Sequence, residues 1–169
     1  FQDSVYEVAV RDGTVYVAVG ASVVAIERDG TPRWRFTTDR TVYSVPAVVG
    51  DTVYVGSTDN HVYALDAADG TQRWAVETDN MIQSSPAVVD GTVYIGSNDT
   101  HVYALDATDD IQWWAVKTDG RVESSPAVVD GTVFVGSRDN RVYALDAADG
   151  TQQWAFETGD MVFSSPAVV

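Results

Sequence analysis

Cysteine is absent from the 169 residues, and its absence removes several kinds of chemistry. Without a thiol the chain forms no disulfide, offers no thiolate nucleophile and binds no metal through sulfur. Long apolar runs are also missing, since no stretch approaches the roughly 18 apolar residues that a membrane helix needs. Residues 1–20 show no basic start followed by an apolar core, as a signal peptide would. We therefore expect no direct membrane insertion by this sequence.

Basic residues are scarce. Ten Lys and Arg stand against 25 Asp and Glu, the formal net charge is -15, and Lys117 is the only lysine. A surface this acidic repels phosphate backbones, so the sequence predicts no nucleic-acid partner. Many aspartates with almost no lysine are typical of proteins from salt-loving microbes, in which high salt screens the repulsion between like charges. We therefore expect a halophilic protein that loses stability at low salt.

One eleven-residue stretch organises what is present. ALDAADGTQRW at residues 64–74 returns as ALDATDDIQWW at 104–114 and as ALDAADGTQQW at 144–154, with a shorter copy, AIERDGTPRW, at 25–34. Each copy ends in a tryptophan, and these tryptophans fall forty residues apart: Trp34, Trp74, Trp114 and Trp154. Such spacing predicts a repeat architecture in which each unit buries one face against the next unit.

Each unit contains four short runs of alternating or β-branched residues separated by Asp/Gly turns, and none shows helical periodicity. This pattern predicts an all-β fold, a β-propeller of four-stranded antiparallel blades. We expect a single propeller domain or fragment over 1–169, with blades at 1–38, 39–78, 79–118 and 119–158, and with 159–169 as the inner strand of a further blade. Prolines inside the SVPAVV and SSPAVV strands place these strands at a free sheet edge, which in a propeller lines the channel: Pro46, Pro86, Pro126 and Pro166.

The repeated stretch also predicts its own turn chemistry. An aspartate in each full copy is expected to accept main-chain N–H bonds within the turn: Asp66, Asp106 and Asp146. Gly70 and Gly150 are expected to supply a positive φ, which glycine adopts without steric cost. Asp110 replaces the glycine in the third unit, and we expect it to enter the same region at some cost.

The pattern Ala-x-Asp-x-x-x-Gly-x-x-x-Trp resembles the tryptophan-docking motif of the PQQ-like, or quinoprotein-type, β-propeller family. The resemblance covers essentially the whole chain, complete at 64–74 and 144–154 and degenerate in the other two copies. It implies that the tryptophans dock between neighbouring blades of a propeller with seven or eight blades. It also favours an extracytoplasmic or membrane-tethered location, reached through segments outside this sequence.

Two functions are compatible with the resemblance. Some members of the family are quinone-dependent dehydrogenases that hold PQQ on the propeller axis together with calcium, whereas others are scaffolds or sensors. The adjacent cysteines of the alcohol dehydrogenases are impossible here, and no Glu, Asn or Asp aligns with their calcium and catalytic sites. We expect a non-enzymatic binding or scaffold module with no cofactor and no catalytic residue. The alternative is a fragment of a PQQ-dependent dehydrogenase.

A metal site is not expected from the histidines, because His61 and His101 are equivalent whereas the third copy has Arg141. The Asp-rich turns also lack the spacing of an EF-hand loop.

Positions at which the repeats differ indicate where a partner binds. The clearest are the segments that enter each inner strand, at 40–43, 80–83, 120–123 and 160–163, which we expect around one mouth of the channel. The candidate residues for contact with a protein or small-molecule ligand are Tyr43, Gln83, Arg121, Glu123 and Phe163. Drift at exposed loop positions is the competing explanation.

Four units and one extra strand leave three assemblies open: a fragment of a larger propeller, a homo-oligomer that completes the ring, or an open arc.

Overall fold

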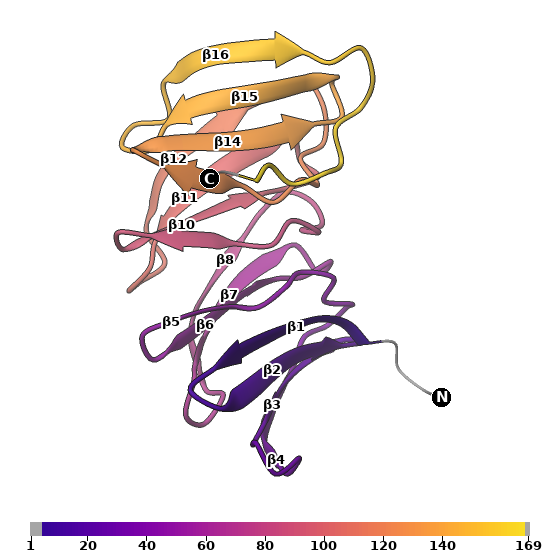
Figure 1. Cartoon of the computed structure of the whole chain (residues 1–169), viewed down its shortest axis with the longest axis vertical. Helices are drawn as coiled ribbons and strands as arrows, with labels where there is room; N and C mark the ends of the chain where they lie inside the picture. Colours follow the sequence, from indigo (N-terminus) through magenta and orange to yellow (C-terminus); the bar gives the residue numbers. More distant parts are fainter. Residues whose placement is uncertain (1–4, 168–169) are drawn as a thin grey trace.

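The computed structural model describes residues 5–167, which form sixteen strands in four separate antiparallel sheets and no helix. Each sheet contains four strands in chain order, and Figure 1 shows the sheets following one another along the long axis, from indigo to yellow. The predicted all-β fold with four-stranded antiparallel blades is confirmed. No helix long and apolar enough to cross a membrane occurs within residues 5–167.

The strand bounds are as follows. Blade 1 contains β1 (Val5–Arg11), β2 (Thr14–Val19), β3 (Ser22–Ile26) and β4 (Pro32–Thr37). Blade 2 contains β5 (Ala47–Val49), β6 (Thr52–Gly56), β7 (His61–Asp66) and β8 (Gln72–Glu77). Blade 3 contains β9 (Ala87–Val89), β10 (Thr92–Gly96), β11 (His101–Asp106) and β12 (Gln112–Lys117). Blade 4 contains β13 (Ala127–Val129), β14 (Thr132–Ser137), β15 (Arg141–Asp146) and β16 (Gln152–Glu157).

The inner strands are shorter than expected. Pro46, Pro86 and Pro126 precede β5, β9 and β13 rather than lying inside them, so each of these strands has three residues. Proline has no N–H to donate to a ladder. Within 159–167 the chain forms no strand, and residues 168–169 lie outside the described part.

The hydrophobic core lies between blades rather than within one. Three apolar clusters fill the three boundaries, and each combines one face of a blade with the facing side of the next. The segment that enters each inner strand adds a fully buried side chain: Val42, Ile82 or Val122. A Cβ at Gly56 would lie 2.2 Å from Ile82, so the glycine that ends β6 makes room for this side chain. The same fit recurs at Gly96 with Val122.

Serine side chains tie successive blades together near the inner strands. The main-chain N–H of Val45 donates to Ser85 Oγ at 2.8 Å, and that of Ser85 donates to Ser125 Oγ at 2.8 Å. The N–H of Ser125 continues the series to Ser165 Oγ at 3.0 Å. Each bond spans forty residues and so joins equivalent positions of neighbouring blades.

The four blades form an open arc, because apolar clusters join each blade to the next in chain order and none joins blade 4 to blade 1 in the described part of the chain. On β16, Trp154 is 46% exposed and Phe156 is 64% exposed, whereas Trp34, Trp74 and Trp114 are 6–8% exposed. The difference arises because no further blade covers β16 among the described residues.

Candidate functional site

The tryptophans of blades 1 to 3 contact the blade that follows. The indole N–H of Trp34 donates to Ala67 O at 3.0 Å, and that of Trp74 donates to Ala107 O at 3.3 Å. Trp114 donates in the same way to Ala147 O at 3.1 Å. The acceptor is in each case the residue after the aspartate of the repeated stretch.

The aspartates of the repeated stretch hold the turn that faces the tryptophan. Asp66 Oδ1 accepts the N–H of Ala68 at 2.8 Å, and Asp106 and Asp146 make the equivalent bond. Hydrogen bonds from Arg73 and from this N–H hold the pKa of Asp66 below its usual value. Gly70 and Gly150 have φ of 75° and 76°.

Asp110 does not follow the expected backbone, because it is not among the residues with positive φ. The turn in blade 3 is instead held by Thr108, whose hydroxyl and N–H both donate to Asp106 Oδ1. A side chain with a Cβ avoids the left-handed region when the turn offers another closure.

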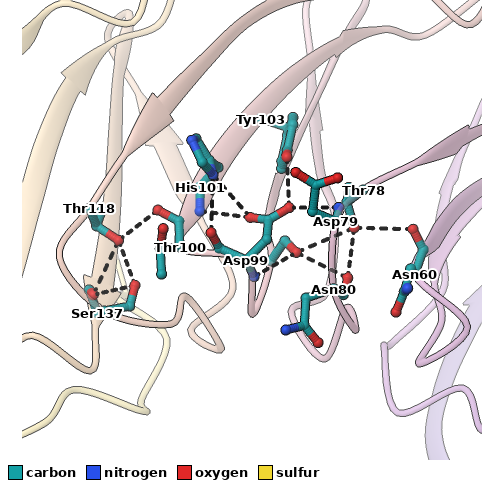
Figure 2. Close-up of polar contacts among 12 residues, drawn as sticks. Asn60, Thr78, Asp79, Asn80, Asp99, Thr100, His101, Tyr103, Thr118 and Ser137 are labelled. Atoms are coloured by element: carbon teal, nitrogen blue, oxygen red, sulfur yellow. Dashed lines mark hydrogen bonds and ion pairs between the residues drawn. The ribbon is translucent and has the colours of Figure 1, made fainter.

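A second aspartate in each of blades 2 to 4 accepts hydrogen bonds from its own blade and from the blade before it, an arrangement that we call the latch. Figure 2 shows Asp99 at its centre: Oδ2 accepts the hydroxyl of Tyr103 at 2.7 Å and the N–H of Asp79 at 3.1 Å. Its Oδ1 accepts the N–H of His101 at 2.9 Å. Burial and the hydrogen bond to Asp99 raise the pKa of Tyr103.

Asp59 accepts the equivalent three bonds. In blade 4, Asp139 Oδ2 accepts the Tyr143 hydroxyl and the N–H of Asp119, but its Oδ1 has no hydrogen-bond partner. The latches are structural, since each joins the outer end of one blade to the next, and their histidines serve the latch. His101 Nδ1 lies 3.3 Å from Asp99 Oδ1, and the ring of His61 stacks on Tyr63.

The predicted site residues lie along one end of the blades, in the segments that enter the inner strands. Tyr43, Gln83, Glu123 and Phe163 occupy the same place in successive units, two residues before the positions that make the inter-blade ties: Val45, Ser85, Ser125 and Ser165. The structure adds three residues from the loops that follow β6, β10 and β14: Thr58, Asn98 and Arg138. We call these seven residues the inner rim.

Glu123, Arg138 and Phe163 form one contact group on the inner rim. Arg138 Nε lies 3.1 Å from Glu123 Oε1, and the Glu123 side chain is only 14% exposed. The guanidinium also lies over the Phe163 ring, 4.7 Å from its centroid, at the distance of a cation–π interaction. Arg138 therefore bridges the segment of its own blade to the next equivalent segment.

Gln83 and Asn98 form a neutral pair at the equivalent place in blade 3. Asn98 Nδ2 donates to Gln83 Oε1 at 3.0 Å. Asn98 is 4% exposed, and its Oδ1 has no hydrogen-bond partner. Buried polar atoms are nearly always paired, so this buried, unpaired carbonyl oxygen is an exception within the described residues.

The remaining predicted residues differ in their surroundings. Tyr43 is 40% exposed, and the hydroxyl of Thr58 donates to Thr41 O, two residues before Tyr43, at 2.9 Å. Arg121 lies two positions before Glu123, and the structure gives its exposed side chain no contact with the inner rim. Only its carbonyl takes part, by accepting the N–H of Arg138 at 2.9 Å.

Thr58, Asn98 and Arg138 were missed by the sequence prediction, although the signal was present. The three loops read STDN at 57–60, SNDT at 97–100 and SRDN at 137–140. Their first and third residues are identical, and these three residues occupy the variable second position. Repeat-to-repeat variation, which selected Gln83 and Glu123, would have selected these residues too. Blade 1 offers no equivalent, because its β2–β3 connection is only Gly20-Ala21.

The described residues do not fit a calcium-bound quinone. No group of three or more His, Asp or Glu side chains that could hold a metal ion occurs within residues 5–167, and the whole sequence lacks the cysteine pair. The carboxylates nearest the inner rim are engaged otherwise: Glu123 pairs with Arg138 and Asp99 with Tyr103.

Two solved structures share the fold. The crystal structure of BamB from Moraxella catarrhalis aligns with a TM-score of 0.81 at 21% sequence identity, over 92% of this chain and 50% of that one. A crystal structure of the computationally designed protein Ika8 aligns with a TM-score of 0.85 at 14% identity, over 96% of this chain and 52% of that one. The chain thus spans about half the length of each.

No curated protein sequence matches the chain. A family model described as outer membrane protein assembly factor BamB does match it, at residues 3–85 and again at 77–169. Because the two matches together span nearly the whole sequence, the chain belongs to this family of PQQ-like β-propeller repeats.

Proposed function

We propose that this chain is a non-enzymatic binding module that contacts a partner protein at the inner rim. The observation that carries the proposal is the contrast between a nearly invariant blade framework and a rim that differs in every unit. Side chains whose contacts build the blades recur at forty-residue intervals, whereas the inner rim presents Tyr, Gln, Glu and Phe in turn. A scaffold that repeats and a surface that varies are typical of proteins that bind through loops.

The chemistry of the inner rim suits a protein partner. Tyr43 and Phe163 expose 40% and 50% of their surface, and exposed aromatic residues carry much of the affinity of protein interfaces. The family name refers to the assembly of outer membrane proteins, which also supports a protein partner.

Site-specific photo-crosslinking tests the proposal. A photoreactive phenylalanine analogue at Tyr43 or Phe163 is expected to capture a partner in the native cell extract, because both side chains are exposed at the inner rim. The matched control places the analogue at Gln72, which is exposed on the outer strand β8. Equal capture from all three positions would contradict a partner site at the inner rim.

The absence of a quinone cofactor is part of the proposal. Titration with PQQ and Ca²⁺, followed by absorbance and by the melting temperature, is expected to show no saturable binding. Saturable, calcium-dependent binding would overturn the non-enzymatic assignment and favour the dehydrogenase alternative.

A further inference from the structure

A groove between blades 3 and 4 lies at the opposite end of the blades from the inner rim. Two adjoining cavities of about 290 and 380 Å³ meet there, and both are lined by Asp90, Tyr94 and Asp130. The outer one also contains Trp113, which is 48% exposed. Asp90 and Asp130 lie in the tight turns that open β10 and β14, with φ of 48° and 47°.

A corresponding groove exists between blades 1 and 2, where two arginines of the chain lie beside the carboxylates of Asp12 and Asp51. That cavity, about 260 Å³, is lined by Arg11 and Arg33. Arg11 Nη1 donates to Val48 O at 2.8 Å, across the boundary between the blades. The structure therefore contains an example of a guanidinium bound in a groove of this kind.

The groove between blades 3 and 4 lacks both arginines. By the strand registers Val89 stands where blade 1 has Arg11, and Trp113 stands where it has Arg33. In the facing turn, Asp130 and Gly131 stand where blade 2 has Gly50 and Asp51, so the groove between blades 3 and 4 keeps a carboxylate there but loses the cations. Val128 occupies the position equivalent to Val48, the blade 2 residue whose carbonyl oxygen accepts the hydrogen bond from Arg11.

Blade 2 keeps a guanidinium at the same outer position. Arg73 donates to both carboxylate oxygens of Asp51, at 3.0 and 2.8 Å, and to Asp66 Oδ2 at 2.7 Å. The residue before the repeat tryptophan is thus an arginine in blades 1 and 2, and blade 3 has the aromatic Trp113 in its place.

The carboxylates of the groove are left without a cation. Asp90 and Asp130 form no ion pair within residues 5–167, and Asp146 uses Oδ1 to accept the N–H of Ala148. An exposed tryptophan beside unpaired carboxylates is the combination that binds a guanidinium, through its ring face and through charge-assisted hydrogen bonds.

We propose that this groove binds an arginine side chain of a basic segment of a partner protein. Trp113 supplies the stacking face, and Asp90 and Asp130 supply the charge, in the place that Arg11 and Arg33 occupy between blades 1 and 2. Arginine is favoured over lysine because its planar guanidinium stacks on an indole and pairs with carboxylates in two directions. The net charge of -15 assists approach of the basic segment but does not select this groove.

The test uses substitutions that the chain already carries at equivalent places, so that the fold is kept. Trp113→Arg copies Arg33, Asp130→Gly copies Gly50, and melting temperatures check each variant. The probe is the peptide acetyl-Gly-Arg-Gly-amide, compared with its lysine and citrulline counterparts and followed by the amide resonance of Gly131 in NMR titrations. Asp12→Asn, in the groove between blades 1 and 2, removes an acidic side chain elsewhere as the matched control.

The arginine peptide is expected to bind saturably to the unchanged protein and to the Asp12→Asn control. Binding should weaken at least about tenfold for the citrulline peptide and for the variants Trp113→Arg and Asp130→Gly, since each loses one of the two attractions. Equal binding of the arginine and citrulline peptides, or unchanged affinity in Asp130→Gly, would overturn the proposal.

Discussion

Gly70 of blade 2 lies directly against the indole ring of Trp34 of blade 1, since a Cβ at Gly70 would come within 2.7 Å of two ring carbons. Gly70→Ala is therefore expected to lower the free energy of unfolding by about 2–4 kcal/mol, from overpacking and from the positive φ together. Gly30→Ala is the matched control, because Gly30 also has a positive φ, 87°, but nothing within 4 Å of its Cβ position. Urea unfolding at fixed salt measures both, and equal losses would show that the tryptophan contact is unimportant.

Removal of a docked tryptophan should cost more than removal of an undocked one. Trp74→Ala is expected to destabilise the protein by about 3–5 kcal/mol, since the ring is buried between blades 2 and 3. Trp154→Ala should cost about 1 kcal/mol or less, because Trp154 is 46% exposed on β16. Similar midpoints for the two variants in chemical unfolding would contradict the docking role.

Thr100 has a backbone conformation that disfavours a β-branched side chain. Its φ is 80°, and the equivalent residues of blades 2 and 4 are asparagines, Asn60 and Asn140, with φ of 76° and 70°. Thr100→Asn should raise the stability by about 1 kcal/mol, because asparagine tolerates the left-handed region better. The reverse change, Asn60→Thr, should lower it by a similar amount. Thermal melts of the two variants provide the measurement, and shifts of the same sign would refute the explanation.

The blades were predictable from the sequence because their signals are local. Alternating apolar residues and Asp-Gly turns fix strands and hairpins within about a dozen residues. The partner of Trp34 was not predictable, since it lies 33 residues further on at Ala67. The latch at Asp99 was not predictable for the same reason, because its bond to the N–H of Asp79 joins separate blades.

The candidate site was predicted in part. Gln83, Glu123 and Phe163 were chosen from repeat variation, and the structure gives each a contact with a loop of the inner rim. Arg121 was chosen by the same rule but remains apart, because variation along a strand entry does not reveal which side chains face each other.

The tyrosine latches predict a loss of stability in alkali. Burial, together with the hydrogen bond to Asp139, raises the pKa of Tyr143 from its ordinary value of 10.0 to about 12. The folded state therefore holds the neutral phenol, whereas the unfolded chain ionises first, so stability is full below about pH 10 and falls as the pH rises toward 12.

The urea midpoint, followed between about pH 9 and 12 together with tyrosinate absorbance, measures this loss. Asp139→Asn should lower the pKa of Tyr143, because it removes the carboxylate that disfavours ionisation. A midpoint independent of pH over this range would contradict the latch.

The acidic surface predicts a dependence on salt. With a net charge of -15, the melting temperature should be clearly higher in about 2 M KCl than in about 0.1 M, because salt screens the repulsion between carboxylates. Sucrose, an uncharged osmolyte, controls for general effects on hydration. Coincident melts at the two salt concentrations would refute the expectation of halophilic behaviour.

The serine ties between blades fix the spacing of the inner-rim positions next to them. Each tie fixes one main-chain N–H to the same atom of the next unit, forty residues further on. The residues two positions earlier, Tyr43, Gln83 and Glu123, are therefore held at a constant pitch whatever their side chains are. A substitution at these positions therefore changes the side chain that the inner rim presents but not the spacing of the backbone that carries it.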